Sequence, residues 1–351
     1  MRDVAVVSFA QAPNVRRDAG RGEIEILLPV VNEAIERSGI PRSDIGFTVS
    51  GSCDFLAGQP FSFVMALDAV QAWPPIQESH VEMDGAWALY EAWVRLQHGD
   101  IDSALVYSFG KSSPGDLPEI LTLQLDPYYV APLWPDSISL AALQARLFLE
   151  SNGHSERDLA EVAVRSRRDA RANPNAQLSG DYDVDALLAE PYLVSPLRRH
   201  DCPPISDGAA AVVLAAGDVA RKVCERPAWI RGIDHRIEPH ALGARDLTRS
   251  PSAALAAEKA GLFERPVDAA ELHAPFTHQE LILRDSLPLG DGVSVNPSGG
   301  ALAANPMMSA GLIRIGEAAR LIMDGKAGRA LAHATSGPCL QQNLVCVLEG
   351  E

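Results

Sequence analysis

Residues 296–311 read NPSGGALAANPMMSAG, and this stretch and its flanks decide the fold. Its paired glycines, its proline and its many small residues indicate backbone held close to another group. A short apolar strand pattern precedes it, and an apolar helical pattern follows with Leu312 and Ile315 on one face. A Gly-Lys pair then leads to RALAHA, a short apolar run typical of a buried strand. Residues 293–337 therefore predict a strand, a glycine turn, a helix and a second strand.

Residues 80–111, HVEMDGAWALYEAWVRLQHGDIDSALVYSFGK, follow the same plan. A short strand leads through a glycine into an apolar helix, and a Gly-Asp pair then leads to the strand ALVYSF. The repetition indicates an internal duplication. Because strands and helices alternate, we expect an α/β fold, with further helices over EIEILLPVVNEAIERSG and SAALAAEKAGL.

The segment between the two halves has a different composition. It contains DPYYVAPLWPDS, which is rich in proline and aromatic residues, and then two helical patterns. Ser155 and Asp158 form a capping box at the start of the second helix. After this segment, CPPISDGAAAVVLAA predicts a turn and a buried strand. The domains we expect are an N-terminal half at 1–112 and 196–220, an inserted loop domain at 113–195 and a C-terminal half at 221–351.

Charge, apolar runs and cysteine spacing argue against several classes of protein. With 30 basic and 46 acidic side chains the formal charge is -16, so the field repels nucleic acid and anionic membranes. No apolar run approaches the roughly 20 residues of a membrane-spanning helix, and the N-terminus reads as a strand rather than a signal peptide. The five cysteines lack CxxC or CxxH spacing, which indicates free thiols and no structural zinc. We expect a cytoplasmic protein with no metal.

Four stretches together resemble the thiolase superfamily, in particular the sterol-carrier-protein-x type and the related lipid-transfer-protein thiolases of actinobacteria. They are CPPISDGAAAVVLAA at 202–216, ELHAPFTHQEL at 271–281, VNPSGGALAANPMMSAG at 295–311 and the C-terminal SGPCLQQNLVCVLEG. The resemblance covers essentially the whole chain. It implies a thiolase fold: two duplicated βαβαβ-type halves with mixed sheets in a layered α-β-α-β-α arrangement, plus a loop domain. It also implies a dimer, either a homodimer or a heterodimer with a related thiolase-like chain.

The chain departs from this family at the nucleophile. A typical thiolase has a reactive cysteine at a helix N-terminus, where the dipole favours the thiolate. Counted from Gly85, that position holds Glu82, followed by Met83 and Asp84. A carboxylate cannot form the acyl-thioester intermediate as a thiolate does. Ordinary thiolysis through this position is therefore not expected.

The family's histidine motifs are also altered. Its Gly-His-Pro element corresponds to Ala304-Asn305-Pro306, and an asparagine amide can donate to an oxyanion but transfers no proton at neutral pH. Its His-Asp-Cys-Phe element corresponds to a stretch that runs from His273 to Phe276. His273 is the best remaining general acid or base. The other interpretation is a histidine at a strand end, bonded to a backbone carbonyl.

The C-terminal cysteine motif is only partly retained. In the family it is Cys-x-Gly-Gly-Gly, whereas here Cys339 is followed by Leu-Gln-Gln-Asn. Cys339 is either the relic of the family's acid/base cysteine or a buried structural thiol. Cys346, inside an apolar strand, is interpreted as structural. Cysteine-dependent thiolysis would require Cys339 or Cys53 in the pocket.

The chemistry that survives these losses is retro-aldol cleavage of a 3-hydroxyacyl-CoA, which needs a base and stabilisation of a thioester enolate. The resemblance supports it, because some actinobacterial members are steroid side-chain aldolases that lack the usual cysteines, use tyrosines and work with a zinc-ribbon and OB-fold partner. The catalytic candidates are His273, Tyr128, Tyr129, Cys339 and Glu82. The oxyanion or substrate-binding candidates are Asn305, Ser298, Gly299, Gly300 and Asp84. Tyr128 and Tyr129 could instead pack at a subunit contact.

A second hypothesis is a degenerate thiolase subunit that binds or supports a catalytic partner and does no chemistry itself. The lyase hypothesis implies an acyl-CoA substrate and no cofactor beyond its CoA, whereas the second hypothesis implies a subunit that positions a partner or a lipid. The basic run RSRRDAR at 165–171 is a candidate surface for the CoA phosphates, with a solvated helix face as the alternative. Arg198, Arg199 and His200 have the same two interpretations, a surface for the CoA phosphates or a solvated surface.

Overall fold

The structure is a computed structural model that describes residues 1–287 and 289–351. Its centre is a ten-stranded sheet with the order β10-β9-β11-β12-β8-β1-β7-β4-β2-β3, and a separate pair of short strands, β5 and β6, lies outside it. The strands are β1 (Val4–Gln11), β2 (Phe47–Gly51), β3 (Glu78–Val81), β4 (Ser103–Lys111), β5 (Tyr192–Val194), β6 (Leu197–Arg198), β7 (Asp207–Ala216), β8 (Ala228–Ile237), β9 (Ala269–Leu272), β10 (Ser294–Val295), β11 (Arg329–Ser336) and β12 (Gln342–Glu349).

The sheet consists of two halves with the same pairing pattern. In the first, β3, β2 and β4 are parallel, and β7 and β1 follow antiparallel. In the second, β10, β9 and β11 are parallel, and β12 and β8 follow antiparallel. The halves meet where Ala5 and Val6 of β1 pair with Trp229 and Ala228 of β8. The predicted duplication and mixed sheets are confirmed.

The α-helices occupy the connections and the segment between the halves. They are α1 (Glu23–Ser38), α2 (Asp54–Ala57), α3 (Ser62–Val70), α4 (Gly85–His98), α5 (Leu117–Leu123), α6 (Ser137–Asn152), α7 (Glu156–Asp169), α8 (Val184–Leu188), α9 (Gly217–Val223), α10 (Pro251–Lys259), α11 (Thr277–Ser286), α12 (Gly300–Ala303) and α13 (Ala310–Met323). The capping box predicted at Ser155 and Asp158 begins α7.

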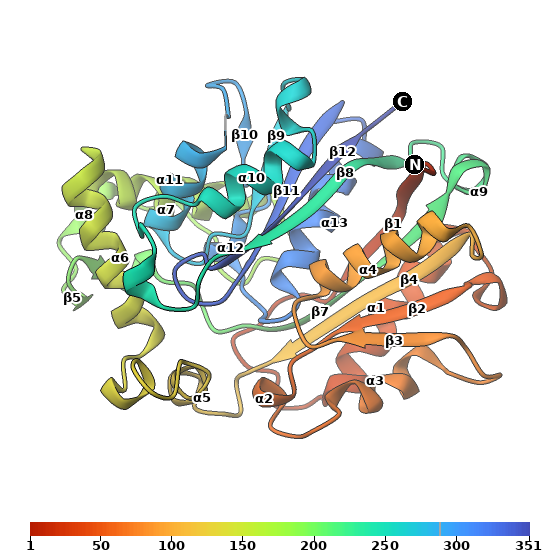
Figure 1. Ribbon diagram of the computed structural model, residues 1–351, viewed down its shortest axis with the longest axis horizontal. Coiled ribbons are helices and arrows are strands. Elements are labelled where there is room, and N and C mark those ends of the chain that lie inside the picture. The colour runs from red at the N-terminus through yellow and green to blue at the C-terminus, as the bar shows by residue number, and fades with distance from the viewer. Residues whose placement is uncertain (288) are drawn as a thin grey trace.

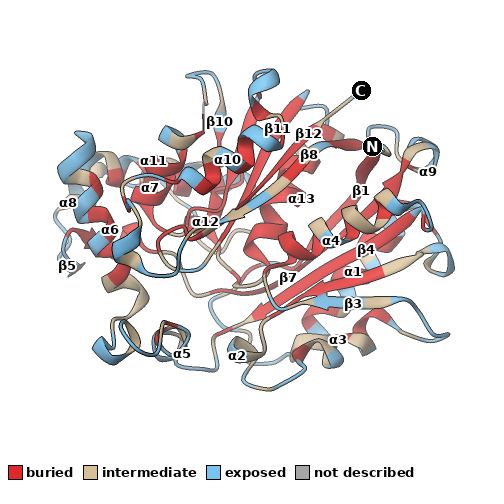
Figure 2. Ribbon diagram, in the orientation of Figure 1, coloured by how far each residue is buried: buried red, intermediate tan, exposed pale blue. Residues whose placement is uncertain are grey.

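Three apolar clusters show how the helices and sheets are layered. One cluster packs α1, α3 and α9 on the outer face of the first half. A second places α4 and α13 between the inner faces of the two halves, and a third packs α6, α7, α10 and α11 on the outer face of the second half. Figure 1 shows α4 and α13 in this central position, and Figure 2 shows buried residues along the central strands and α13. The expected α-β-α-β-α order is confirmed.

The two central helices share one cap. Asp84 precedes α4, and its carboxyl oxygens accept the backbone N–H groups of Ala86, Gly311 and Leu312 at 2.8, 2.9 and 3.0 Å. The first N–H groups of a helix have no partner inside it, so one side chain satisfies the starts of both α4 and α13. Burial raises the pKa of the Asp84 carboxyl above its usual value, even though the three donors act to lower it.

The chain between β4 and β7 leaves the sheet and forms α5 to α8 and the β5–β6 pair, at the left of Figure 1. Its helices α6 and α7 pack against the C-terminal half, while α5 lies near α2 of the N-terminal half. The segment therefore reaches both halves on the side where their long loops meet. Among the described residues, no helix is both long and apolar enough to cross a membrane.

Candidate functional site

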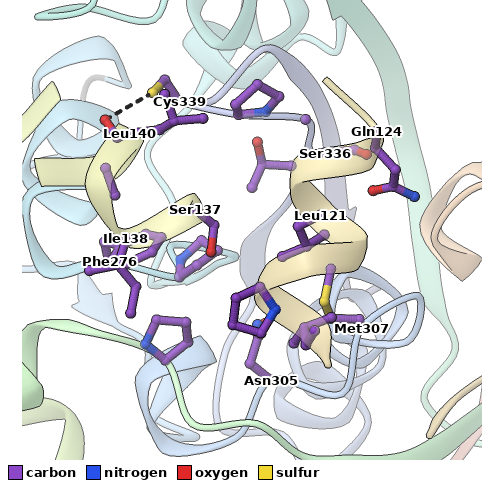
Figure 3. Close-up of a pocket in the computed structure, with 18 of the residues that line it drawn as sticks. Leu121, Gln124, Ser137, Ile138, Leu140, Phe276, Asn305, Met307, Ser336 and Cys339 are labelled. Atoms are coloured by element: carbon purple, nitrogen blue, oxygen red, sulfur yellow. Dashed lines mark hydrogen bonds between the residues drawn. The ribbon is translucent and has the colours of Figure 1, made fainter. Parts of the chain in front are cut away.

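A cavity of about 530 Å³ lies between α5, α6 and the loops at one end of the sheet (Figure 3). The loops are residues 202–206 before β7, the start of α11, residues 305–308 before α13 and residues 335–342 between β11 and β12. Three of them carry motifs singled out in the sequence: CPPIS, HAPF and ANPMM. The motifs thus meet in space although they are up to about a hundred residues apart in the chain.

The wall of the cavity is mainly apolar. Two leucines of α5 (Leu117 and Leu121) and Leu125 just after it line the cavity, together with Ile138 and Leu140 of α6 and Phe276 before α11. Apolar ligand groups are stabilised there by about 25 cal/mol for each Å² removed from water. The polar lining groups that the described residues provide are hydroxyls, side-chain amides, one imidazole and two thiols, and no carboxylate or tyrosine is among them.

Asn305 holds a fixed place in this wall, seen at the lower end of the cavity in Figure 3. Its backbone N–H donates to Ser206 Oγ at 3.0 Å, and the next residue, Pro306, forms a bridge with Ser206. Its side-chain Oδ1 lies 3.1 Å from Nε2 of His273. Among the described residues no acceptor bonds to its Nδ2, so the amide nitrogen is available to a ligand.

His273 lies behind Asn305 and does not line the cavity. The side chain is 7% exposed, and burial lowers its pKa to about 3, with smaller contributions from His333 and Arg314. The imidazole is therefore neutral at physiological pH. A general acid or base at His273 stays a prediction, and in this conformation Asn305 lies between the ring and a cavity ligand.

Cys339 lies at the opposite end of the cavity from Asn305 (Figure 3). Its backbone is held in the left-handed region, with φ of 56°, and its carbonyl accepts from Arg245 Nη1 at 3.1 Å and Gln144 Nε2 at 3.4 Å. Its Sγ donates to the carbonyl of Leu140 at 3.6 Å. Burial raises the pKa of the thiol to about 11, so at neutral pH it is a protonated wall group and a poor nucleophile.

The glycine turn predicted to hold an enolate oxygen does not reach the cavity. Ser298 donates its backbone N–H and its hydroxyl to Glu271 at 3.0 and 2.8 Å. The N–H of Gly299 donates to the Asn296 carbonyl at 2.8 Å, and that of Gly300 to Ser298 Oγ at 3.4 Å. In this conformation these N–H groups are hydrogen-bonded within the protein, away from the cavity, and their role as oxyanion donors stays a prediction.

The two tyrosines proposed as catalytic are directed away from the cavity. Tyr128 and Tyr129 are 81% and 80% exposed and do not line it. Their backbone N–H groups donate to Asp126 Oδ1 at 2.9 and 2.7 Å, which fixes the turn that carries them. In this conformation neither hydroxyl can act on a ligand in the cavity.

The basic run at 165–171 is largely engaged within the protein. Arg165 pairs with the buried Glu280, Arg167 donates to the carbonyl of Leu302, and Arg168 and Arg171 pair with Asp169 and Asp181. A phosphate would have to compete with these partners. Of the other candidates, Arg198 pairs with Glu156, and His200 is buried next to Asp201.

The structure adds one titratable group to the candidate site that the sequence did not indicate. His240, in the exposed segment between β8 and α10, is the only imidazole among the described residues that line the cavity. Nothing in its local sequence, EPHALG, marks it as functional. Within the described residues there is no group of three or more histidine, cysteine or acidic side chains arranged to hold a metal ion.

Comparison with known proteins agrees with this geometry, although no family model matches the chain. The chain is 28% identical to an acetyl-CoA acetyltransferase of Methanothermobacter thermautotrophicus, over 90% of each protein. It is 27% identical to benzoylsuccinyl-CoA thiolase subunit BbsB of Thauera aromatica, over 58% of this chain and 60% of that protein. Human sterol carrier protein 2 is 23% identical, over 66% of this chain and 50% of its own length.

A solved structure named Ltp2-ChsH2(DUF35) aldolase has the same fold. It superposes with a TM-score of 0.84, covers 99% of this chain and 98% of its own, and is 20% identical in sequence. The chain thus has the thiolase fold and is similar in sequence to thiolases. At this identity the structural likeness shows the shared fold, and the chemistry has to be argued from the residues of this thiolase-fold chain.

In this thiolase-fold protein the position expected for the nucleophile lies outside the cavity. Glu82 is exposed, and its Oε1 accepts the backbone N–H of Asp54, the first residue of α2, at 2.6 Å. Cys53 is adjacent, and its pKa is raised by burial and by the Glu82 carboxylate. Asp84 is fully engaged as the shared helix cap. Neither Glu82 nor Asp84 lines the cavity, so their predicted roles at a cavity ligand do not match their positions.

Proposed function

We propose that this thiolase-fold protein is a carbon–carbon lyase that cleaves a 3-hydroxyacyl-CoA thioester by a retro-aldol reaction. The proposal rests above all on Asn305, whose side-chain amide is fixed in the wall of a largely apolar cavity. A fixed amide donor stabilises a developing enolate oxygen. Removal of one such donor from a comparable site lowers kcat by about 10²-fold to 10³-fold. Stabilisation by such a donor does not require a covalent intermediate.

The reaction proceeds in two steps that conserve atoms and electrons. A base takes the proton of the 3-hydroxyl, the bond between C2 and C3 breaks, and its electron pair moves into the thioester carbonyl. The products are a ketone or aldehyde and an enolate, which takes a proton at C2 to become the shorter acyl-CoA. Asn305 Nδ2 donates to the enolate oxygen. His240, the imidazole of the lining, accepts the hydroxyl proton and returns one to C2.

Thiolysis fits the same cavity poorly because it needs a thiolate. Burial raises the pKa of Cys339 to about 11 and that of Cys202 to about 12, with the Asp201 carboxylate adding to the shift at Cys202. Both lining thiols are thus protonated at neutral pH, and a carboxylate occupies the nucleophile position. A retro-aldol reaction has no need for these groups.

The lining supports a bulky apolar acyl group as substrate, as in the side chain of a steroid or another lipid. Leucines of α5 and α6 and Phe276 surround the volume in which this group would lie. The proposed chemistry uses no cofactor beyond the CoA of the substrate. We further propose that the chain acts in a dimer, or with an OB-fold and zinc-ribbon partner. In support, the solved structure of the same fold is named for two components, Ltp2 and ChsH2(DUF35).

The test is turnover of a panel of 3-hydroxyacyl-CoA thioesters by the full chain, alone and with any co-purified partner. We expect equal amounts of a shorter acyl-CoA and a carbonyl compound, and no acyl group on the protein by intact-mass spectrometry. Asn305→Ala should lower kcat by about 10²-fold with a smaller change in KM. A thioester on Cys339 during turnover would contradict the proposal.

The alternative is a non-catalytic thiolase-fold subunit that supports a catalytic partner. The observation in its favour is that the described lining contains no carboxylate or tyrosine. On this alternative, the chain binds acyl-CoA or the partner, the partner alone turns over substrate poorly, and His240→Ala leaves the activity of the pair unchanged. A large loss of activity with His240→Ala favours the lyase.

A further inference from the structure

The histidine behind the cavity has only one possible arrangement of its proton. The backbone N–H of Thr335 donates to Nδ1 of His273 at 3.3 Å. A backbone N–H is always a donor, so Nδ1 must be the unprotonated nitrogen of a neutral imidazole. The ring proton is therefore on Nε2, 3.1 Å from Asn305 Oδ1.

This proton decides how the Asn305 amide is oriented. Because Nε2–H is a donor, the atom of Asn305 that faces it must be the oxygen, and the NH₂ group takes the other side. Asn305 lines the cavity and His273 does not, so the side away from the ring is the cavity side. The inverted amide would bring two donors together at His273 and present an oxygen to the ligand.

Burial is the main reason that the His273 ring stays neutral, because it lowers the pKa of the imidazole. His333 on β11 and Arg314 on α13 lower this pKa further, by smaller amounts. Arg314 is buried and paired with Glu271 at 2.6 Å. His333 is itself buried, with a pKa lowered by burial to about 4, and its Nε2 lies 2.9 Å from Asn343 Oδ1.

We propose that His273 is a positioning residue: it exchanges no proton during the reaction, and its fixed Nε2–H holds the Asn305 amide with the NH₂ group turned toward the cavity ligand. The ligand it serves is an anion that develops on a carbonyl oxygen, such as a thioester enolate. The kinetic consequence rests on the proposed function, whereas the tautomer and the amide orientation do not. A donor that is already oriented needs no reorganisation when charge develops on the ligand.

The first test needs no activity. Long-range ¹H–¹⁵N correlation spectra of the full chain with labelled histidine distinguish the two neutral tautomers and the imidazolium. The chain has nine histidines, and the signals of His273 are those missing from His273→Gln. We expect the Nε2–H tautomer, unchanged from pH 5.5 to 8.5. An Nδ1–H tautomer, or a titration midpoint within this range, overturns the proposal.

The second test separates positioning from proton transfer. His273→Gln can retain a donor near the place of Nε2, whereas His273→Leu retains the bulk without a donor. Relative to wild type, the leucine variant should lose about 10-fold to 10²-fold in kcat with little change in KM, and the glutamine variant should regain most of this loss. The shape of the pH profile of kcat should be the same in wild type and His273→Gln.

The outcomes of the two tests are distinguishable. A limb of the pH profile that disappears in His273→Gln, or a leucine variant as active as wild type, overturns the positioning role. If wild type turns over no substrate, the lyase proposal fails, while the spectra still decide the orientation of Asn305. If the far-UV circular dichroism of His273→Leu shows that it does not fold, the pH profiles of kcat of wild type and His273→Gln decide between positioning and proton transfer.

Discussion

The carboxyl group of Asp84, at the start of α4, accepts the backbone N–H of Gly311, at the start of α13, at 2.9 Å, although the two residues are 227 positions apart. The contact joins the two duplicated halves through their central helices. In α13 the N-cap residue, Ser309, makes no capping bond through its own side chain. The start of α13 thus depends on a side chain from the other half.

Asp84→Ala should destabilise the whole protein. The change leaves three N–H groups without the partner seen in the structure, and we expect a loss of about 2–4 kcal/mol in the free energy of unfolding. Urea unfolding followed by circular dichroism measures it. Asp324→Ala, at the exposed C-terminal end of α13, is the control and should stay within about 0.5 kcal/mol of wild type. Equal effects of the two changes would contradict the shared cap.

His278 should make the protein sensitive to acid. Burial lowers its pKa to about 3, against about 6.5 in an unfolded chain. The contribution of neutral His278 to the free energy of unfolding is complete above about pH 6.5. It is lost as the pH falls toward 3, because the unfolded state takes up the proton first. His278→Gln removes this group and can keep a donor for Gln144.

The expected result is a difference between two pH curves of unfolding free energy. Between pH 6.5 and 4.5, wild type should lose about 2–3 kcal/mol more than His278→Gln. Comparing the two proteins is necessary because Asp84, Asp201 and Glu271 have pKa values raised by burial and act in the opposite direction. Parallel curves would mean that His278 takes up its proton over the same pH range in the folded and the unfolded protein.

The sequence predicted the layered fold because its signals are local. A strand, a glycine and an apolar helix repeat at residues 80–111 and 293–337, and the structure has β3-α4-β4 and β10-α13-β11 there. The second copy also contains α12, which the pattern did not separate from the glycine turn. The cap at Asp84 was not predictable, since its partners Gly311 and Leu312 come from a distant segment.

Gly110→Ala should disturb the cavity through the backbone. A Cβ at Gly110, in β4, would lie 1.9 Å from the carbonyl oxygen of Met307, which lines the cavity two residues after Asn305. The segments must move apart, so we expect a loss of about 1–3 kcal/mol in stability and weaker binding of an acyl-CoA analogue by calorimetry. The control is Gly243→Ala, where the added atom meets nothing within 4 Å. Unchanged binding by Gly110→Ala would exclude this coupling.

The cysteines should differ in their reaction with iodoacetamide at pH 7.5. Cys53 and Cys224 are partly exposed, whereas Cys202, Cys339 and Cys346 are buried. Burial raises the pKa of all five thiols, so the difference in labelling comes mainly from exposure. Peptide mass spectrometry should show the first two labelled well before the others, and all five labelled at similar rates in urea. Rapid labelling of Cys339 in the folded protein would reveal an activated thiol.

The candidate site was predictable only in part. The sequence motifs led to Asn305 and Cys339, and both line the cavity. They did not show that the Ser298 hydroxyl is hydrogen-bonded to Glu271 and Arg314, because such buried hydrogen bonds depend on tertiary contacts. His240 has no motif, and only the loop after β8 brings it to the cavity. The exposure of Tyr128 and Tyr129 likewise depends on how the turn at Asp126 is built.

The pairing of β1 with β8 also limits where further strands can be added to the sheet. Since Val6 pairs with Ala228 at the junction, the inner edges of both halves are closed, and β3 and β10 form the two ends of the strand order in the described chain. A free sheet edge is a template for strands of other polypeptides. β10 has two residues and β3 has four. Addition of a foreign strand, whether in assembly or in aggregation, is therefore favoured at the β3 end.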